Sequence, residues 1–144
     1  MKSRFVLLIV VISVSFASTS HALAPYKKVF DAKYVKPTGD AEFRAAFKKA
    51  SCNTCHVKGK KKDVVNDFGL QLAELIEGNG KDRLAEARKG GADAKKAEQQ
   101  KLIKELEEAL TQVETAEAPG GGTYGELLKS HKLPGPEGAK SVRK

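Results

Sequence analysis

Residues 40–56 read DAEFRAAFKKASCNTCH, and this stretch decides how the sequence is interpreted. Its apolar residues recur at i, i+3, i+4 and i+7, as Phe43, Ala46, Phe47 and Ala50. This spacing predicts one face of a helix that begins after an Asp40 cap and leads into Ser51 and Cys52. Phe43 and Phe47 are expected to be core residues that hold the following segment still.

That segment contains Cys52, Cys55 and His56 in the order C-x-x-C-H, and the chain has no other cysteine. In an exported protein this pattern is typical of a c-type haem attachment site. Two thiols about one helical turn apart can reach the two vinyl groups on one porphyrin edge, and the adjacent imidazole can bind the iron. We therefore expect one covalent haem c, with Cys52 and Cys55 as its thioether residues and His56 as the proximal iron ligand.

Three other interpretations of the motif compete with haem attachment. A redox-active C-x-x-C usually accompanies a βαβ pattern, and no convincing strand is visible. A structural zinc site needs four ligands, and only His131 remains as a second imidazole after signal removal. A disulfide between Cys52 and Cys55 would close a very short loop and stabilise little. The haem interpretation is favoured over all three.

The N-terminal segment 1–22 has the pattern of a secretory signal peptide. Two basic residues precede a 12-residue apolar run, 5–16, which is too short to span a membrane. Cleavage is expected after Ala22, because cleavage after Ala24 would leave Pro25 as the first residue. The protein is thus expected to be exported, periplasmic or secreted, with no stable membrane span after signal removal.

The mature chain has a net positive charge and few large apolar residues. Removing residues 1–22 takes away two of the 26 basic residues, which leaves 24 against 18 acidic ones and a charge of +6. It also takes away the only methionine, Met1. Only 27 residues of the remainder are Val, Ile, Leu, Phe or Tyr, which is thin for a core. Either part of the chain stays loose, or an apolar group other than side chains fills the centre.

The rest of the chain is predicted to be helical with short connections. Further helices are expected over about 64–77, 81–89, 92–115 and 123–131. Residues 26–35 are predicted to be extended or a loose turn, which Pro37-Thr38-Gly39 ends. The N-terminal half of 92–115 is nearly all polar and is expected to project or fray. Four parts follow: the signal peptide 1–22, an N-terminal extension 23–37, a haem domain 38–134 with a flexible hinge at 119–122, and a basic disordered tail 135–144.

Over residues 38–78 the sequence resembles the small exported monohaem c-type cytochromes of bacteria. Cys52, Cys55 and His56 match their attachment motif, and Asn66-Asp67-Phe68-Gly69 resembles an N-x-aromatic-G element that follows the motif in some of them. The sequence departs from their class I pattern because the mature chain lacks a methionine for the distal ligand. The resemblance implies an all-α, cytochrome c-like domain wrapped around one haem, with an additional longer charged helix. It also implies a one-electron carrier rather than an enzyme.

The distal iron ligand is left open by the sequence. His131 is a candidate by elimination, but it can equally be an exposed histidine at the end of a helix. A five-coordinate or water-bound iron and a lysine ligand from 58–62 are the alternatives. An open sixth position would favour a different function, a haem protein that binds small ligands as a gas sensor or a peroxidase-like enzyme.

The lysine-rich run 58–62 follows the motif directly. It is expected either to be a solvated loop or to form a positive collar around an exposed haem edge. Such a collar would attract redox partner proteins with acidic docking surfaces. Nucleic acid is not expected as a partner, because the protein is predicted to be exported and has no aromatic stripe for base stacking.

Overall fold

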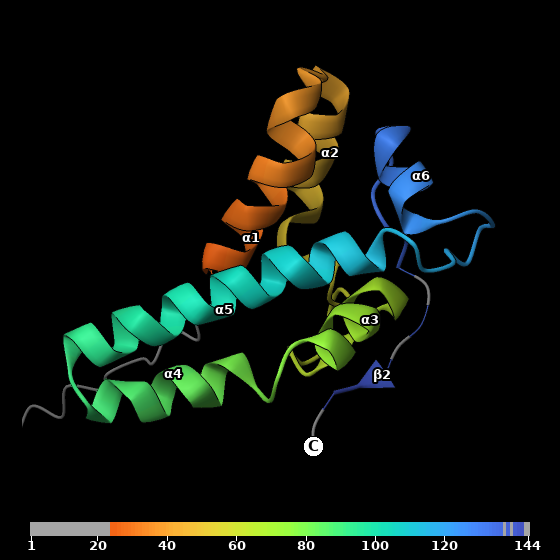
Figure 1. Cartoon of the computed structure of the whole chain (residues 1–144). Coiled ribbons are helices and arrows are strands. Elements are labelled where there is room, and N and C mark those ends of the chain that lie inside the picture. The colour runs from red at the N-terminus through yellow and green to blue at the C-terminus, as the bar shows by residue number, and fades with distance from the viewer. Residues whose placement is uncertain (1–23, 137, 139, 143–144) are drawn as a thin grey trace, which may run out of the picture.

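The computed structural model of the chain describes residues 24–136, 138 and 140–142 (Figure 1). The predicted signal peptide 1–22 lies outside these residues. The described part is mostly helical, which confirms the all-α class, and its one sheet has two short strands. None of the helices described is both long and apolar enough to cross a bilayer.

The helices and strands follow one another with short connections. In chain order they are α1 (Ala24–Phe30), η1 (Asp31–Val35), η2 (Lys36–Thr38), α2 (Ala41–Ala50), η3 (Ser51–Thr54), β1 (Val64–Val65), α3 (Asp67–Leu75), α4 (Gly80–Lys89), α5 (Ala92–Val113), α6 (Tyr124–Lys129) and β2 (Lys140–Ser141). The helix predicted over 64–77 is thus shorter and begins at Asp67, because residues 64–65 pair with β2 instead.

The segment 26–35, predicted to be extended or a loose turn, is helical, so that prediction was wrong. α1 continues into one wider π turn, η1, and then into η2, which Gly39 ends with a φ of 68°. Because a π turn takes more residues than an α turn, Phe30 and Val35, which are five positions apart, lie on the same face of the segment, and both are buried. The single proton of the Tyr34 hydroxyl is shared between the Leu110 carbonyl at 3.0 Å and Glu114 Oε1 at 2.7 Å, which ties η1 to the far end of α5.

Helix α2 begins where the sequence predicts. The Asp40 carboxylate accepts hydrogen bonds from the backbone N–H groups of Glu42 and Phe43, the usual way to satisfy the first turn of a helix. The helix does not run straight into the cysteines, because Ser51 has a φ of 50°. This kink starts a new turn, η3, for the residues that follow.

Helices α4 and α5 form an antiparallel hairpin at one end of the molecule (Figure 1). The polar N-terminal half of α5 was predicted to project or fray, and the hairpin corrects this. Leu102 is buried, and Arg83 of α4 pairs with Glu98 and Glu105 of α5 at 2.6 Å each. Sequence periodicity could not reveal this packing, because the pairs that Arg83 makes with Glu98 and Glu105 follow no apolar pattern.

The C-terminal half of α5 packs against α1 and α3, and the core lies there. Phe30 stacks on Phe47 with ring centroids 5.2 Å apart, and Phe68 meets Phe30 edge-on. Tyr124 of α6 closes the same cluster against Phe68. The centre of the described residues is therefore filled by their own side chains.

Two C-terminal stretches take part in backbone hydrogen bonding. The stretch 119–122, predicted to be a flexible hinge, lies in a hydrogen-bonded turn in which Ala118 donates to the Gly122 carbonyl at 2.9 Å. The tail 135–144 was predicted to be disordered, yet β2 pairs antiparallel with β1 in the register Val64↔Ser141. Backbone pairing of this kind needs no apolar pattern, so the composition of the tail concealed it.

Candidate cofactor site

Cys52, Cys55 and His56 lie on one turn at the end of α2. The backbone N–H groups of Cys55 and His56 both donate to the Cys52 carbonyl, at 3.3 and 3.1 Å. The two cysteines are not linked to each other, and each is partly exposed. The structure thus brings together the three residues that the sequence singles out as the attachment motif.

Asn66 fixes this turn from the opposite side. Its backbone N–H donates to the Cys55 carbonyl at 3.1 Å. Its side-chain amide donates to the Thr54 carbonyl and to the Gly135 carbonyl, both at 3.0 Å, and its side-chain oxygen caps α3 by accepting from Gly69. Asn66 is only 1% exposed, so each of these polar groups is satisfied within the protein.

Gly69 allows α3 to approach the motif closely. A Cβ at this position would collide with the Cys55 carbonyl oxygen and would lie 2.9 Å from the Cβ of Val65. No residue other than glycine fits here without a shift of the backbone. The N-x-aromatic-G element therefore has a structural role in this chain: the asparagine and the glycine hold the C-x-x-C-H turn, and Phe68 anchors α3 in the core.

His56 is partly buried beside this contact. Its backbone pairs with Val65, and its ring Nδ1 is buried and has no hydrogen-bond partner. Burial lowers the pKa of His56, and the positive charge of Lys62 lowers it further, against the opposing effect of the Val64 and Lys62 carbonyls. The imidazole is thus biased toward the neutral form, which is the form that binds metals.

The thiol of Cys55 is not poised for thiol redox chemistry. Burial, together with the neighbouring Cys52, raises the pKa of Cys55 to about 12. Redox-active cysteines work as thiolates and generally have a lowered pKa. Cys55 is therefore a protonated thiol, not a thiolate, at neutral pH.

The described residues likewise assemble no cluster suited to zinc. A structural zinc site takes four ligands, and His, Cys, Asp and Glu side chains gather nowhere in residues 24–136, 138 and 140–142 as a group of three or more able to hold a metal ion. Haem attachment needs fewer side chains than a zinc site, namely two free thiols and one imidazole on the proximal face of the haem. Cys52, Cys55 and His56 fit that requirement, and the unpartnered Nδ1 of His56 is consistent with a ring that has a further bond to make.

The lysine-rich run 58–62 forms the loop between His56 and β1. The loop is closed by backbone pairing at its base, where Val57 donates to the Val64 carbonyl at 3.2 Å. Lys58, Lys60, Lys61 and Lys62 are all exposed. The loop therefore presents positive charge beside the motif, at the place where the sequence predicts a collar.

His131 lies away from the motif in this structure. Its Nδ1 is 2.7 Å from Asp40 Oδ2, and its ring stacks on Phe43 with centroids 5.7 Å apart. Both partners belong to the first turn of α2, whereas the cysteines follow its last turn. Ten helical residues separate these ends by about 15 Å. The structure thus does not bring His131 and His56 together.

In the sequence there is only a weak indication that Asn66 and Gly69 contact the motif turn. Asn66 and Gly69 belong to a run that the sequence marks by resemblance, but their contacts with the Cys55 carbonyl depend on how α3 packs. Gly135 had no signal, because its carbonyl meets Asn66 across 69 residues of chain.

Comparison of the chain with protein-family models, with curated proteins and with solved structures finds no match.

Proposed function

We propose that this protein is an exported c-type cytochrome that carries single electrons. One haem c would be attached through Cys52 and Cys55, with His56 as the proximal iron ligand. The iron would supply one-electron redox chemistry, and no catalytic group is assigned to the chain. The observation that carries the proposal is the C-x-x-C-H turn, whose two thiols are free and whose imidazole keeps an unpartnered buried nitrogen.

The residues around the motif have a consistent task in this proposal. Asn66 and Gly69 hold the backbone of the turn, so that the two thiols and the imidazole keep their relative positions. A fixed ligand geometry reduces the rearrangement that accompanies a change in iron charge. The exposed lysines of 58–62 would attract a redox partner with an acidic docking surface.

A haem stain after denaturing electrophoresis tests the attachment. The mature chain, produced in a host that attaches haem to exported proteins, is expected to stain and to gain the mass of one haem. Replacing Cys52 and Cys55 by alanine should abolish both signals, because no thioether can form. Replacing Lys60 by glutamine is the matched control and should leave them unchanged. A wild-type chain that never gains the mass of haem would refute the proposal.

One observation favours a second candidate function, a haem protein with an open sixth position. His131, the other imidazole in the described residues, is held by Asp40 and Phe43 rather than near His56. In this case the reduced wild-type protein should bind carbon monoxide, and replacing His131 by alanine should not change its spectrum. If His131 were the distal ligand, only the variant would bind carbon monoxide, and the electron-carrier function would be favoured.

A further inference from the structure

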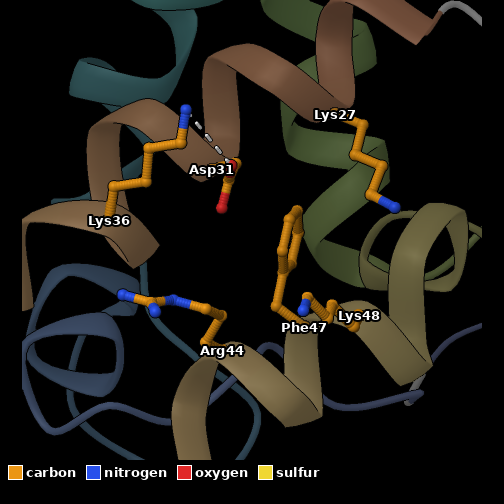
Figure 2. A pocket seen from close by; sticks show the side chains of 6 residues that line it. All are labelled: Lys27, Asp31, Lys36, Arg44, Phe47 and Lys48. Atoms are coloured by element: carbon orange, nitrogen blue, oxygen red, sulfur yellow. Dashed lines mark ion pairs between the residues drawn. The ribbon is translucent and has the colours of Figure 1, made fainter. Parts of the chain in front are cut away.

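A second feature of the surface lies away from the cysteines, between α1, η2 and α2. Here a pocket of about 490 Å³ opens to solvent. Figure 2 shows the six residues that line it, which are Lys27, Asp31, Lys36, Arg44, Phe47 and Lys48. The volume is within the range of small-molecule sites in proteins.

The pocket has an excess of positive charge. Four of its side chains are cationic, and they come from three different elements around one opening. The single acid, Asp31, is already paired with Lys36 at 3.7 Å. Charge is therefore unbalanced by three units in a small volume.

Of the four cations, only Lys36 has an ion-pair partner within the described residues. Arg44 and Lys48 are four residues apart on the same helix face, and within the described residues neither has an ion-pair partner. Like charges at this spacing repel each other and weaken a helix. On the opposite wall, the Nζ atom of Lys27 lies over the Phe47 ring, 5.7 Å from its centroid. The aromatic ring that lines the pocket is thus also in contact with a positive charge.

We propose that this pocket binds a phosphate-bearing anion, either as a free phosphate compound or as the headgroup of an anionic phospholipid. A phosphate group presents three or four oxygens and can be shared by cations that approach from several directions. The planar guanidinium of Arg44 can make two parallel hydrogen bonds to it, and the lysines add point charges. A carboxylate has only two oxygens and would leave part of this lining unused. The inference is independent of the proposed haem.

Inorganic pyrophosphate is the probe for the free form, measured by isothermal titration calorimetry on the mature chain at low ionic strength. We expect one binding site per chain. The double variant Arg44→Gln/Lys48→Gln should bind about tenfold more weakly or worse, because both cations that α2 contributes to the pocket are lost. The control Lys58→Gln/Lys60→Gln removes the same charge from the loop beside the motif, and its affinity should change less than twofold.

Vesicles that contain phosphatidylglycerol test the headgroup source. Retention of the chain on these vesicles, with release by pyrophosphate and loss in the pocket variant, would assign the site to lipid. Pyrophosphate binding without retention would assign it to a free phosphate compound. The proposal is overturned if neither probe binds, if the pocket variant and the control weaken equally, or if citrate binds as tightly as pyrophosphate.

Discussion

At the scale of single residues, the contact between α3 and the motif turn depends on the absence of one side chain. Gly69 lies against the Cys55 carbonyl, and next to it the Asn66 backbone donates to the same oxygen at 3.1 Å. A Cβ at residue 69 would enter the space that this hydrogen bond occupies. The asparagine and the glycine are therefore coupled, and neither can be understood from its own side chain alone.

Replacing Gly69 by alanine should destabilise the protein by about 1–3 kcal/mol, because overpacking forces the backbone to move. The change should also alter the amide signals of Cys55 and Asn66 in an NMR spectrum. Urea unfolding followed by circular dichroism measures the loss. Gly120 is the matched control, since a Cβ there would meet no atom within 4 Å. Equal stability of the two variants would show that α3 does not need the close approach.

At the scale of elements, α4 and α5 are joined by the guanidinium of Arg83, at a position where two packed helices usually bury apolar side chains. Arg83 donates two hydrogen bonds to Glu105, at 2.6 and 2.8 Å, and one to Glu98 at 2.6 Å. It also donates to the Glu77 carbonyl at 2.8 Å, which fastens the end of α3 to the hairpin. Such planar, bidentate pairing is specific to arginine, so a lysine could not replace it.

Replacing Arg83 by glutamine should cost about 1.5–3 kcal/mol at neutral pH, the usual value for hydrogen bonds to charged groups. The hydrogen bond from Arg83 lowers the pKa of Glu105 below its ordinary value of 4.5. The stabilisation is therefore present above pH 4.5 and is lost as the pH falls through the lower folded value.

Thermal unfolding at a series of pH values tests this prediction. The difference between wild type and Arg83→Gln should shrink below pH 4.5, because the wild type loses the pair while the variant has none to lose. The control Lys89→Gln removes an exposed pair, with side chains 74% and 73% exposed, and should change stability little at any pH. A difference that stays constant down to pH 2 would contradict the pairing.

At the scale of the whole molecule, the core consists of aromatic and aliphatic side chains contributed by α1, η1, α2, α3, α5 and α6, together with Ala118. The N-terminal segment 24–38 is part of this core and not an appendage, since Val35 has no exposed surface. The sequence left open whether another apolar group fills the centre. The arrangement of Phe30, Phe47, Phe68 and Tyr124 indicates that helix packing in this chain is sustained by its own residues.

The chain without covalent haem should therefore keep most of its helical signal. In the variant with alanine at Cys52 and Cys55, we expect the circular dichroism at 222 nm to stay close to that of the wild type, with a cooperative thermal transition. The single variant Cys52→Ala serves as the comparison that retains one attachment point. Loss of most of the helical signal in the double variant would show that the cofactor is required for the core.

Local sequence patterns were sufficient to predict the helical class, the Asp40 cap, and the grouping of Cys52, Cys55 and His56 on one turn. Each of these depends on residues within about four positions of one another, where hydrogen-bonding and spacing rules act directly. The role of those three residues in haem attachment stays a prediction that the haem stain tests.

Tertiary structure alone decided the features that join distant parts of the chain. These are the burial of α1 against α5, the contact of α3 with the Cys55 carbonyl, the strand pairing of the tail, and the position of His131 on Asp40, 91 residues away in sequence. Elimination made His131 a candidate iron ligand, but a partner at that separation is chosen by packing and charge. Long-range packing and long-range charge pairing follow no periodicity in a single sequence, because they arise only when helices and strands from distant parts of the chain meet.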